Sequence, residues 1–132
     1  MKNNLHSGLM IRLYTEQKCF GPGVARLLRG VERCRSLRAA AQSMEMAYSK
    51  AWTVIHTAEE GLGIKLLRSA AGGRGGGGAT LTEEALELLS AYESYCADVE
   101  AYAKERFAQC FAFYNEMRAD TAKTNSGEED AL

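Results

Sequence analysis

The sequence predicts a mainly α-helical α+β protein that carries one small β-hairpin. Two observations lead to this fold class: apolar residues recur at helical spacing over several stretches, and a glycine-rich segment separates two short β-compatible runs. The chain has 132 residues, of which 46% are apolar and 25% charged, and this fits one globular domain with an appended element. No run approaches the roughly 18 consecutive apolar residues of a membrane helix, and the first residues lack the apolar stretch of a signal peptide. We therefore expect a cytoplasmic protein with no membrane partner.

A strand and three short helices are expected in the first half of the chain. Residues 9–14 are apolar and β-compatible, which predicts a strand. Pro22 suits the first position of a helix over 22–34, in which apolar residues recur every three to four positions. Ser36 is a suitable N-cap for a second, alanine-rich helix. After a short break, a third helix is predicted over 47–60.

The third helix can be oriented at about 100° per residue. One narrow stripe, expected to face the core, contains Ala51, Ile55, Ala58 and Leu62. The opposite side carries the polar residues Ser49, Thr53, His56 and Glu60, with Lys50 and Trp52 on the flanks. Two short helices joined by a tight turn, the second with polar and cationic side chains near its N-terminus, are typical of a helix-turn-helix that enters the major groove of DNA.

A glycine-rich loop lies between two strand candidates, residues 64–68 and 79–81. Residues 72–78 hold six glycines around Arg74, so the backbone can approach a ligand closely while one guanidinium reaches a phosphate or a minor groove. A nucleotide-binding P-loop would need Gly-Lys-Ser/Thr at the start of a helix, which this segment lacks. The hairpin is therefore interpreted as a wing beside the helix-turn-helix. An idle flexible loop is the alternative.

The net charge of −1 is distributed unevenly along the chain. Residues 20–80 carry nine Lys or Arg against four Asp or Glu, whereas residues 81–132 carry four against twelve. A basic first part with an acidic remainder is typical of a protein whose first part binds a polyanion. Ordinary surface charge would also produce such an imbalance.

One long helix over residues 83–118 is expected after the hairpin. Thr82 can cap it, Glu83 and Glu84 suit the positive end of its dipole, and Leu81 with Leu86 can form a hydrophobic staple.

A helix of this length would extend about 50 Å, which exceeds what a domain of this size covers. We therefore expect it to pair with a second copy of the chain, and a helix that breaks and folds back is the alternative. The predicted dimerisation residues are Leu89, Tyr92, Cys96, Val99, Ala103, Cys110, Phe113 and Met117. This division gives a winged helix-turn-helix domain over 1–82, the dimerisation helix over 83–118 and a disordered acidic tail over 119–132.

Four motifs occur in a definite order along the first half. They are Ser36-Leu37-Arg38-Ala39-Ala40-Ala41, Ala47-Tyr48-Ser49-Lys50-Ala51-Trp52, Leu62-Gly63-Ile64-Lys65-Leu66-Leu67, and the glycine-rich segment that ends in Ala79-Thr80-Leu81-Thr82. In this order they resemble the N-terminal DNA-binding domain of the molybdate-responsive (ModE-type) regulators and, more distantly, the winged helix of LysR-type regulators. The resemblance covers about residues 20–92. It implies a winged-helix fold, operator DNA as the ligand and a dimer.

With the helix orientation, this resemblance implies a set of DNA-contacting residues. They are Ser36, Arg38, Tyr48, Ser49, Lys50, Thr53, His56 and Arg74. Two positions depart from the family pattern: Glu45 stands where the turn usually holds glycine, and Ala47 stands where a serine cap is usual. Residues 83–132 contain no strand-rich segment that could form an oxyanion-binding module, so molybdate or another oxyanion effector is not expected.

No enzyme site, metal site or cofactor is expected. His6 and His56 have no sequence neighbours that would complete a nucleophile or metal constellation. The four cysteines, Cys19, Cys34, Cys96 and Cys110, form no CxxC pair and are expected to be buried free thiols, with a metal or disulfide framework as the alternative.

Two function hypotheses follow from these features. The first is a transcription regulator that binds a pseudo-palindromic operator as a homodimer, through a recognition helix and a glycine-rich wing. The second is a winged-helix module that binds other proteins and not DNA, which the overall charge near zero would suit.

Overall fold

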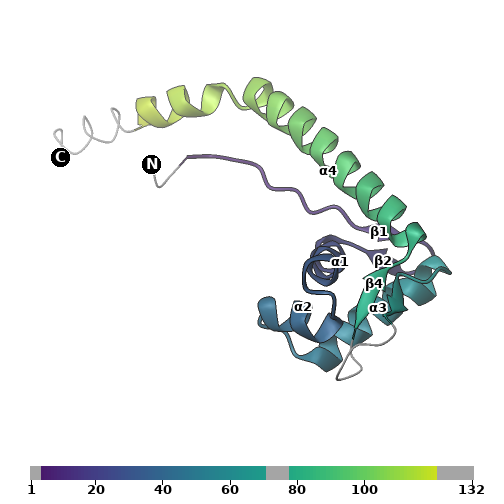
Figure 1. Ribbon diagram of the computed structural model, residues 1–132. Helices are drawn as coiled ribbons and strands as arrows, with labels where there is room; N and C mark the ends of the chain where they lie inside the picture. The colour runs from purple at the N-terminus through teal and green to yellow at the C-terminus, as the bar shows by residue number, and fades with distance from the viewer. Residues whose placement is uncertain (1–3, 71–77, 122–132) are drawn as a thin grey trace. The chain divides into compact units, whose positions relative to one another are not determined.

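The computed structural model describes residues 4–70 and 78–121. It divides into two compact units, Met10–Tyr95 and the combination of Met1–Leu9 with Cys96–Leu132. The first unit contains the helices α1 (Pro22–Cys34), α2 (Leu37–Ser43) and α3 (Tyr48–Leu62) with two antiparallel hairpins. The hairpins are β1 (Leu13–Tyr14) with β2 (Lys18–Phe20), and β3 (Leu67–Ser69) with β4 (Ala79–Leu81) (Figure 1). This is the α+β winged helix that the sequence predicts.

Helices α1 and α2 form where the sequence predicts them. Pro22 starts α1, and α2 is capped by Ser36, whose Oγ accepts a hydrogen bond of 2.9 Å from the Ala39 amide. Gly30 of α1 lies so close to α2 that an added Cβ would come within 3.0 Å of the Ala40 Cβ. These small residues allow the two helices to pack closely.

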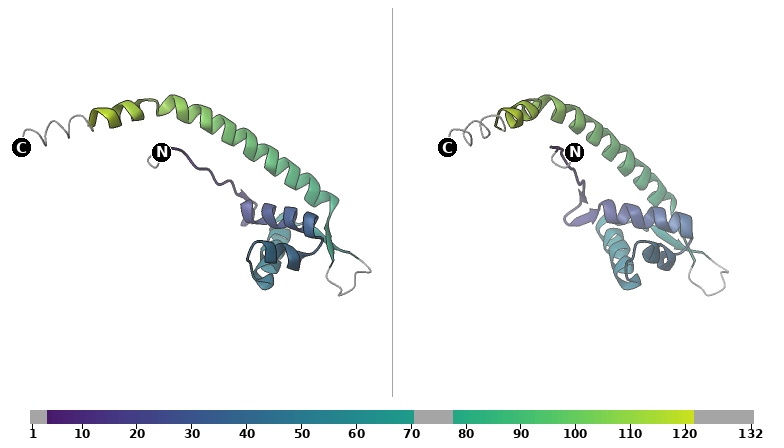
Figure 2. Two further views of the ribbon diagram at one scale, coloured as in Figure 1. Left: turned by 60° about the vertical axis from the view of Figure 1, so that its left-hand side comes forward. Right: turned by 90° about the vertical axis from the view of Figure 1, so that its left-hand side faces the viewer.

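Helix α3 packs its predicted stripe into the core. Ala51, Ile55 and Ala58 are fully buried, whereas Leu62 is only half-buried at the C-terminal end. In both views of Figure 2, α2 and α3 lie together on one side of α1, with which both are in contact. The three helices therefore enclose one core, to which α1 contributes Leu27, Leu28 and Val31.

The two hairpins differ from the sequence expectation. Only Leu13 and Tyr14 of the strand predicted over 9–14 pair, and their partner is β2, which the sequence analysis did not predict. Strand β3 begins at Leu67 and not at residue 64, because the Leu66 and Leu67 amides bond to the side chain of Glu59. Strand β4 occupies its predicted residues. The loop around Arg74 lies outside the described residues.

Helix α4 (Glu83–Cys110) starts as predicted and ends earlier than predicted. Thr82 caps it by accepting a 3.0 Å hydrogen bond from the Ala85 amide. The helix stops at a turn over residues 111–112, and residues 113–121 are again helical. The single helix expected over 83–118 is therefore interrupted. Of the tail expected over 119–132, residues 122–132 lie outside the described part, and 119–121 are helical.

The cysteines also differ from expectation, because only Cys19 is buried. Cys34 and Cys110 are exposed and Cys96 is half-buried, and all four are free thiols. Within residues 4–70 and 78–121, no group of His, Cys, Asp and Glu side chains could hold a metal ion. No helix in the same ranges is long and apolar enough to cross a membrane.

Candidate nucleic-acid interface

The exposed side of α3 presents a polar ridge. Ser49, Lys50 and Thr53 are all exposed, as the helical periodicity predicts. The Thr53 hydroxyl donates a 3.0 Å hydrogen bond to the Ser49 carbonyl oxygen. Its oxygen can still accept a hydrogen bond from outside, so the ridge offers hydroxyl groups and one ammonium group to a ligand.

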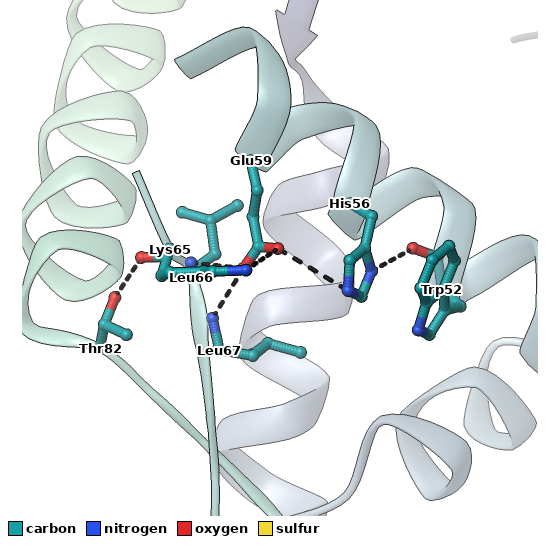
Figure 3. Close-up of polar contacts among 7 residues, drawn as sticks. All are labelled: Trp52, His56, Glu59, Lys65, Leu66, Leu67 and Thr82. Carbon is teal, nitrogen blue, oxygen red and sulfur yellow. Dashed lines mark hydrogen bonds and ion pairs between the residues drawn. The ribbon is translucent and has the colours of Figure 1, made fainter. Parts of the chain in front are cut away.

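Trp52 and His56 form a stacked pair beside this ridge. Their ring centroids are 3.7 Å apart, and the His56 Nδ1 lies 2.9 Å from the Trp52 carbonyl oxygen (Figure 3). Trp52 is nevertheless 47% exposed. A large aromatic side chain held in one orientation at the surface can stack on a ligand with little loss of conformational entropy.

A second pair joins the two helices of the helix-turn-helix. The Arg38 guanidinium of α2 lies 4.2 Å from the centroid of the Tyr48 ring, which belongs to the first turn of α3. This cation–π contact holds Arg38 at the N-terminal end of α3.

A groove of about 790 Å³ runs between α3 and the β3–β4 hairpin. We call it the wing groove. Its lining includes aromatic and cationic side chains, namely Arg38, Tyr48, Trp52, His56, Lys65 and Arg68, together with the carboxylates of Glu59 and Glu84. The structure therefore brings together Arg38, Tyr48 and His56, which the sequence singled out.

The Glu59 carboxylate links α3 to the start of the β3–β4 hairpin. It is 8% exposed, and its Oε2 accepts hydrogen bonds from the Leu66 amide at 2.7 Å and the Leu67 amide at 3.3 Å (Figure 3). Its Oε1 lies 3.9 Å from His56 Nε2 and 4.0 Å from Lys65 Nζ. A charged acceptor that satisfies two backbone amides stabilises this junction, so it sets the position of β3 beside α3.

The backbone directly after α1 forms hydrogen bonds with the start of β4, the second strand of the β3–β4 hairpin. The Arg35 carbonyl oxygen accepts a 2.9 Å hydrogen bond from the Ala79 amide, and Ser36 forms a β-bridge with Gly78. Ser36, predicted to contact DNA, thus has its side-chain oxygen engaged at the α2 cap. Arg74, also predicted, lies outside the described residues.

Several residues of this surface were not singled out from sequence. Lys65 and Arg68 line the wing groove, and Glu59 organises it. The excess of Lys and Arg over residues 20–80 was the only sequence signal for the two cations. The sequence placed Trp52 on the flank of α3 but did not include it among the DNA-contacting residues.

Two predicted dimerisation residues are buried within their own chain. Leu89 is fully buried and Tyr92 is 6% exposed. The Tyr92 ring packs edge-on against Phe20 at 4.9 Å, and its hydroxyl donates a 2.6 Å hydrogen bond to the Ile11 carbonyl oxygen. These residues are therefore not available to a second chain, contrary to expectation, and Tyr92 is held in place by the β1–β2 hairpin, which the sequence did not predict, and by the segment before it.

The other predicted dimerisation residues are at least partly accessible in the single chain. Cys96, Val99 and Ala103 are half-buried, and the exposed residues are Cys110, Phe113 and Met117.

Comparison with known proteins gives matches over the N-terminal part of the chain. Residues 24–86 match the family described as bacterial regulatory helix-turn-helix protein, lysR family. The chain is 31% identical over 94 residues to the transcriptional regulator ModE of Haemophilus influenzae, covering 70% of this chain and 36% of that protein. It is 34% identical over 73 residues to the molybdenum-pterin-binding protein MopB of Rhodobacter capsulatus, covering 55% and 27%. The chain thus covers about a third of the length of these curated relatives.

Proposed function

We propose that the chain, whose residues 24–86 match the family described as bacterial regulatory helix-turn-helix protein, lysR family, is a transcription regulator that binds double-stranded operator DNA. The observation that carries the proposal is the exposed polar ridge of α3 beside the wing groove, which Arg38, Lys65 and Arg68 line. An α-helix with such a ridge fits the major groove, where polar side chains meet base edges and cations meet phosphates. The family matched is one of regulators and not of enzymes.

Base contacts are assigned to Ser49, Lys50 and Thr53. All three are exposed in the N-terminal half of α3, the part of a recognition helix that reaches base edges. Arg38 and Tyr48 lie beside them at the start of the helix, where they would meet the phosphate backbone of one strand.

The β3–β4 hairpin is proposed as the wing. Arg68 lies in β3 and lines the wing groove, and a contact of Arg74, which lies outside the described residues, with a minor groove or a phosphate is part of the proposal. Glu59 and Thr82 support this role because they hold the base of the hairpin against α3 and α4.

The active species is proposed to be a homodimer that binds a pseudo-palindromic site. Supporting this, the residues that follow α4 include Phe111, Phe113 and Met117, which are 46%, 49% and 54% exposed. A second copy of the chain would cover such apolar side chains. A two-fold dimer would place two recognition helices on half-sites about one helical turn apart, or a multiple of it.

The lone tryptophan provides a direct test of DNA binding. Trp52 is exposed beside the α3 ridge, so its fluorescence should change when duplex DNA is added. Titration with a random-sequence duplex at low and high salt should give an affinity that falls steeply with salt, through counterion release. Little affinity at any salt would instead indicate a protein-binding module. Genome-wide mapping of bound sites would then identify the operator.

A further inference from the structure

A second groove lies on the other side of α3. It has a volume of about 390 Å³ and is bordered by β1–β2, the start of α1, and the α3 residues Thr53, Val54 and Thr57. We call it the hairpin groove. At about 100° per residue, Trp52 lies on one side of Ser49 and Thr57 lies on the other. The wing groove and the hairpin groove therefore flank the polar ridge on opposite sides.

Three cations from separate parts of the chain border the hairpin groove. Arg12 lies directly before β1, Lys18 begins β2, and Arg26 is in the second turn of α1. All three are exposed, and none forms an ion pair with another residue in the described part of the chain. No Asp or Glu occurs among the residues that line the groove. The groove is therefore a concentrated positive surface without an internal counter-charge.

The N-terminus of α1 opens onto the same groove. Its N-cap is Gly21, which offers no side-chain hydrogen bond, and the first turn contains no acidic residue. A Cβ added to Gly23 would meet nothing within 4 Å, so there is open space beside this turn. The unsatisfied amides and the helix dipole add to the attraction that the three cations exert on an anion.

We propose that the hairpin groove binds phosphates of the second DNA strand, opposite the strand that meets the wing groove. This inference rests on the proposed function. A recognition helix about 10–12 Å wide nearly fills the major groove, which is about 12 Å wide, so one phosphate backbone runs along each of its sides. On one side of α3 the cations are Arg38, Lys65 and Arg68, and on the other they are Arg12, Lys18 and Arg26. The apolar lining residues Met10 and Val24 suit the sugar faces between phosphates.

The first experiment removes the three cations together, as Arg12→Ala, Lys18→Ala and Arg26→Ala in one chain. Binding to a random-sequence duplex is followed through Trp52 fluorescence over a range of salt concentrations. If three phosphate contacts are lost, the slope of log K against log salt becomes shallower by about 2–3, and affinity at moderate salt falls about ten- to hundredfold. The matched control is the triple alanine variant at Lys104, Arg106 and Arg118, which loses the same charge and lines neither groove. It should keep the wild-type slope.

The second experiment uses Gly23→Asp, with the neutral Gly23→Asn as its control. An acidic residue in the first turn of α1 favours the helix dipole, and there is open space for the side chain, so the melting temperature should be unchanged or raised. The same carboxylate would repel a phosphate, so DNA affinity should fall several-fold for Gly23→Asp relative to Gly23→Asn. A purely structural role for this turn would move stability and affinity in the same direction.

The outcomes separate this inference from the proposed function. Wild-type protein without salt-dependent DNA binding would refute the function itself. Wild-type binding with an unchanged salt slope in the hairpin-groove variant, or equal affinity of Gly23→Asp and Gly23→Asn, would refute the second-strand contact and leave the function standing.

Discussion

Glu45 holds the turn between the two helices of the helix-turn-helix in an unusual backbone conformation. Its φ is 54°, in the left-handed region that favours glycine. Three backbone amides of the turn donate hydrogen bonds to carbonyl oxygens at the end of α2: Met44 and Met46 to Ala41, and Glu45 to Gln42. The glycine usual at this position in the resembling family is therefore explained by the backbone, and this chain retains the turn at a cost in strain.

Glu45→Gly should raise stability because it removes this strain. A non-glycine residue in the left-handed region costs about 1–2 kcal/mol, and part of the gain is offset by the greater freedom of glycine in the unfolded chain. We expect the free energy of unfolding in urea to increase by about 0.5–1 kcal/mol. Glu45→Ala keeps a Cβ at the same φ and should gain nothing. Equal stability of the glycine and alanine variants would contradict the explanation.

Glu59 is predicted to control both stability and the position of the wing. Glu59→Ala would leave the Leu66 and Leu67 amides without their acceptor, at a cost of about 1–3 kcal/mol in the free energy of unfolding. Glu59→Gln keeps an acceptor oxygen of the same reach and should lose less. Urea denaturation of the two variants measures the difference. If the glutamine variant lost as much as the alanine variant, the carboxylate charge and not its hydrogen bonds would be responsible.

At the level of secondary structure, the helix starts and the packed helix faces were predicted correctly from signals that lie within a few residues of each other in the sequence. Pro22, Ser36 and Thr82 mark helix starts, and the apolar spacing inside α1 and α3 marks the faces that pack. Strand β2 had no such signal. The turn at residues 15–17 contains neither glycine, proline nor asparagine, and the hairpin is held by contacts distant in sequence, such as the 2.9 Å hydrogen bond from Thr15 Oγ1 to the Gly61 carbonyl oxygen.

The packing of this hairpin on α3 should make Gly61 irreplaceable. In a helix interior, alanine is favoured over glycine by about 1 kcal/mol. At Gly61, however, an added Cβ would come within 2.8 Å of the Cys19 Cβ in β2. We expect Gly61→Ala to lower the free energy of unfolding by about 1–3 kcal/mol through overpacking. Gly23→Ala, where nothing lies within 4 Å, should be neutral or stabilising. Thermal unfolding of both variants tests the contact, and an unchanged Gly61→Ala protein would contradict it.

The ion pair between α1 and α4 should make a small, pH-dependent contribution. Arg29 donates to both carboxylate oxygens of Glu93, and this hydrogen bonding lowers the pKa of Glu93. Because the folded pKa is depressed, the stabilisation is present above the unfolded pKa and is lost as pH falls through the folded pKa. Glu93→Gln should therefore cost less than about 1 kcal/mol near neutral pH, since both partners are partly exposed. Its difference from wild type should vanish in acid. A difference that persisted at low pH would point to packing.

For the molecule as a whole, the sequence predicts one part of the candidate interface, the ridge of α3, but not the two grooves beside it. Periodicity within one helix places Ser49, Lys50 and Thr53 on the exposed side of α3. The two grooves beside them depend on elements that meet only in the folded chain. Lys65 reaches the wing groove from outside the helix, and Lys18 reaches the hairpin groove from a strand that was not predicted. A glutamate such as Glu59 is usually solvated on a helix, so its burial could not be read from the sequence.

Assembly is the property of the whole chain that the last prediction addresses. Leu89 and Tyr92 are buried within the first unit, so we assign the proposed dimer contact to residues further along α4 or beyond it. Val99 is half-buried in the single chain and belongs to the second unit, whose exposed apolar residues include Phe113 and Met117. Val99→Glu should therefore disfavour the pairing of two chains, because a carboxylate would be desolvated at the contact.

This substitution should separate affinity for one half-site from affinity for two. A monomer binds each half-site independently, whereas in a dimer the second half-site binds as an intramolecular event at a high effective concentration. We expect Val99→Glu to be monomeric by light scattering and to bind a full operator about a hundredfold or more weakly, with affinity for a single half-site unchanged. Leu86→Glu is the control, since Leu86 is 40% exposed and lies in the first unit. A wild-type chain that is monomeric at micromolar concentration, with Val99→Glu binding the full operator equally well, would refute dimerisation through this part of the chain.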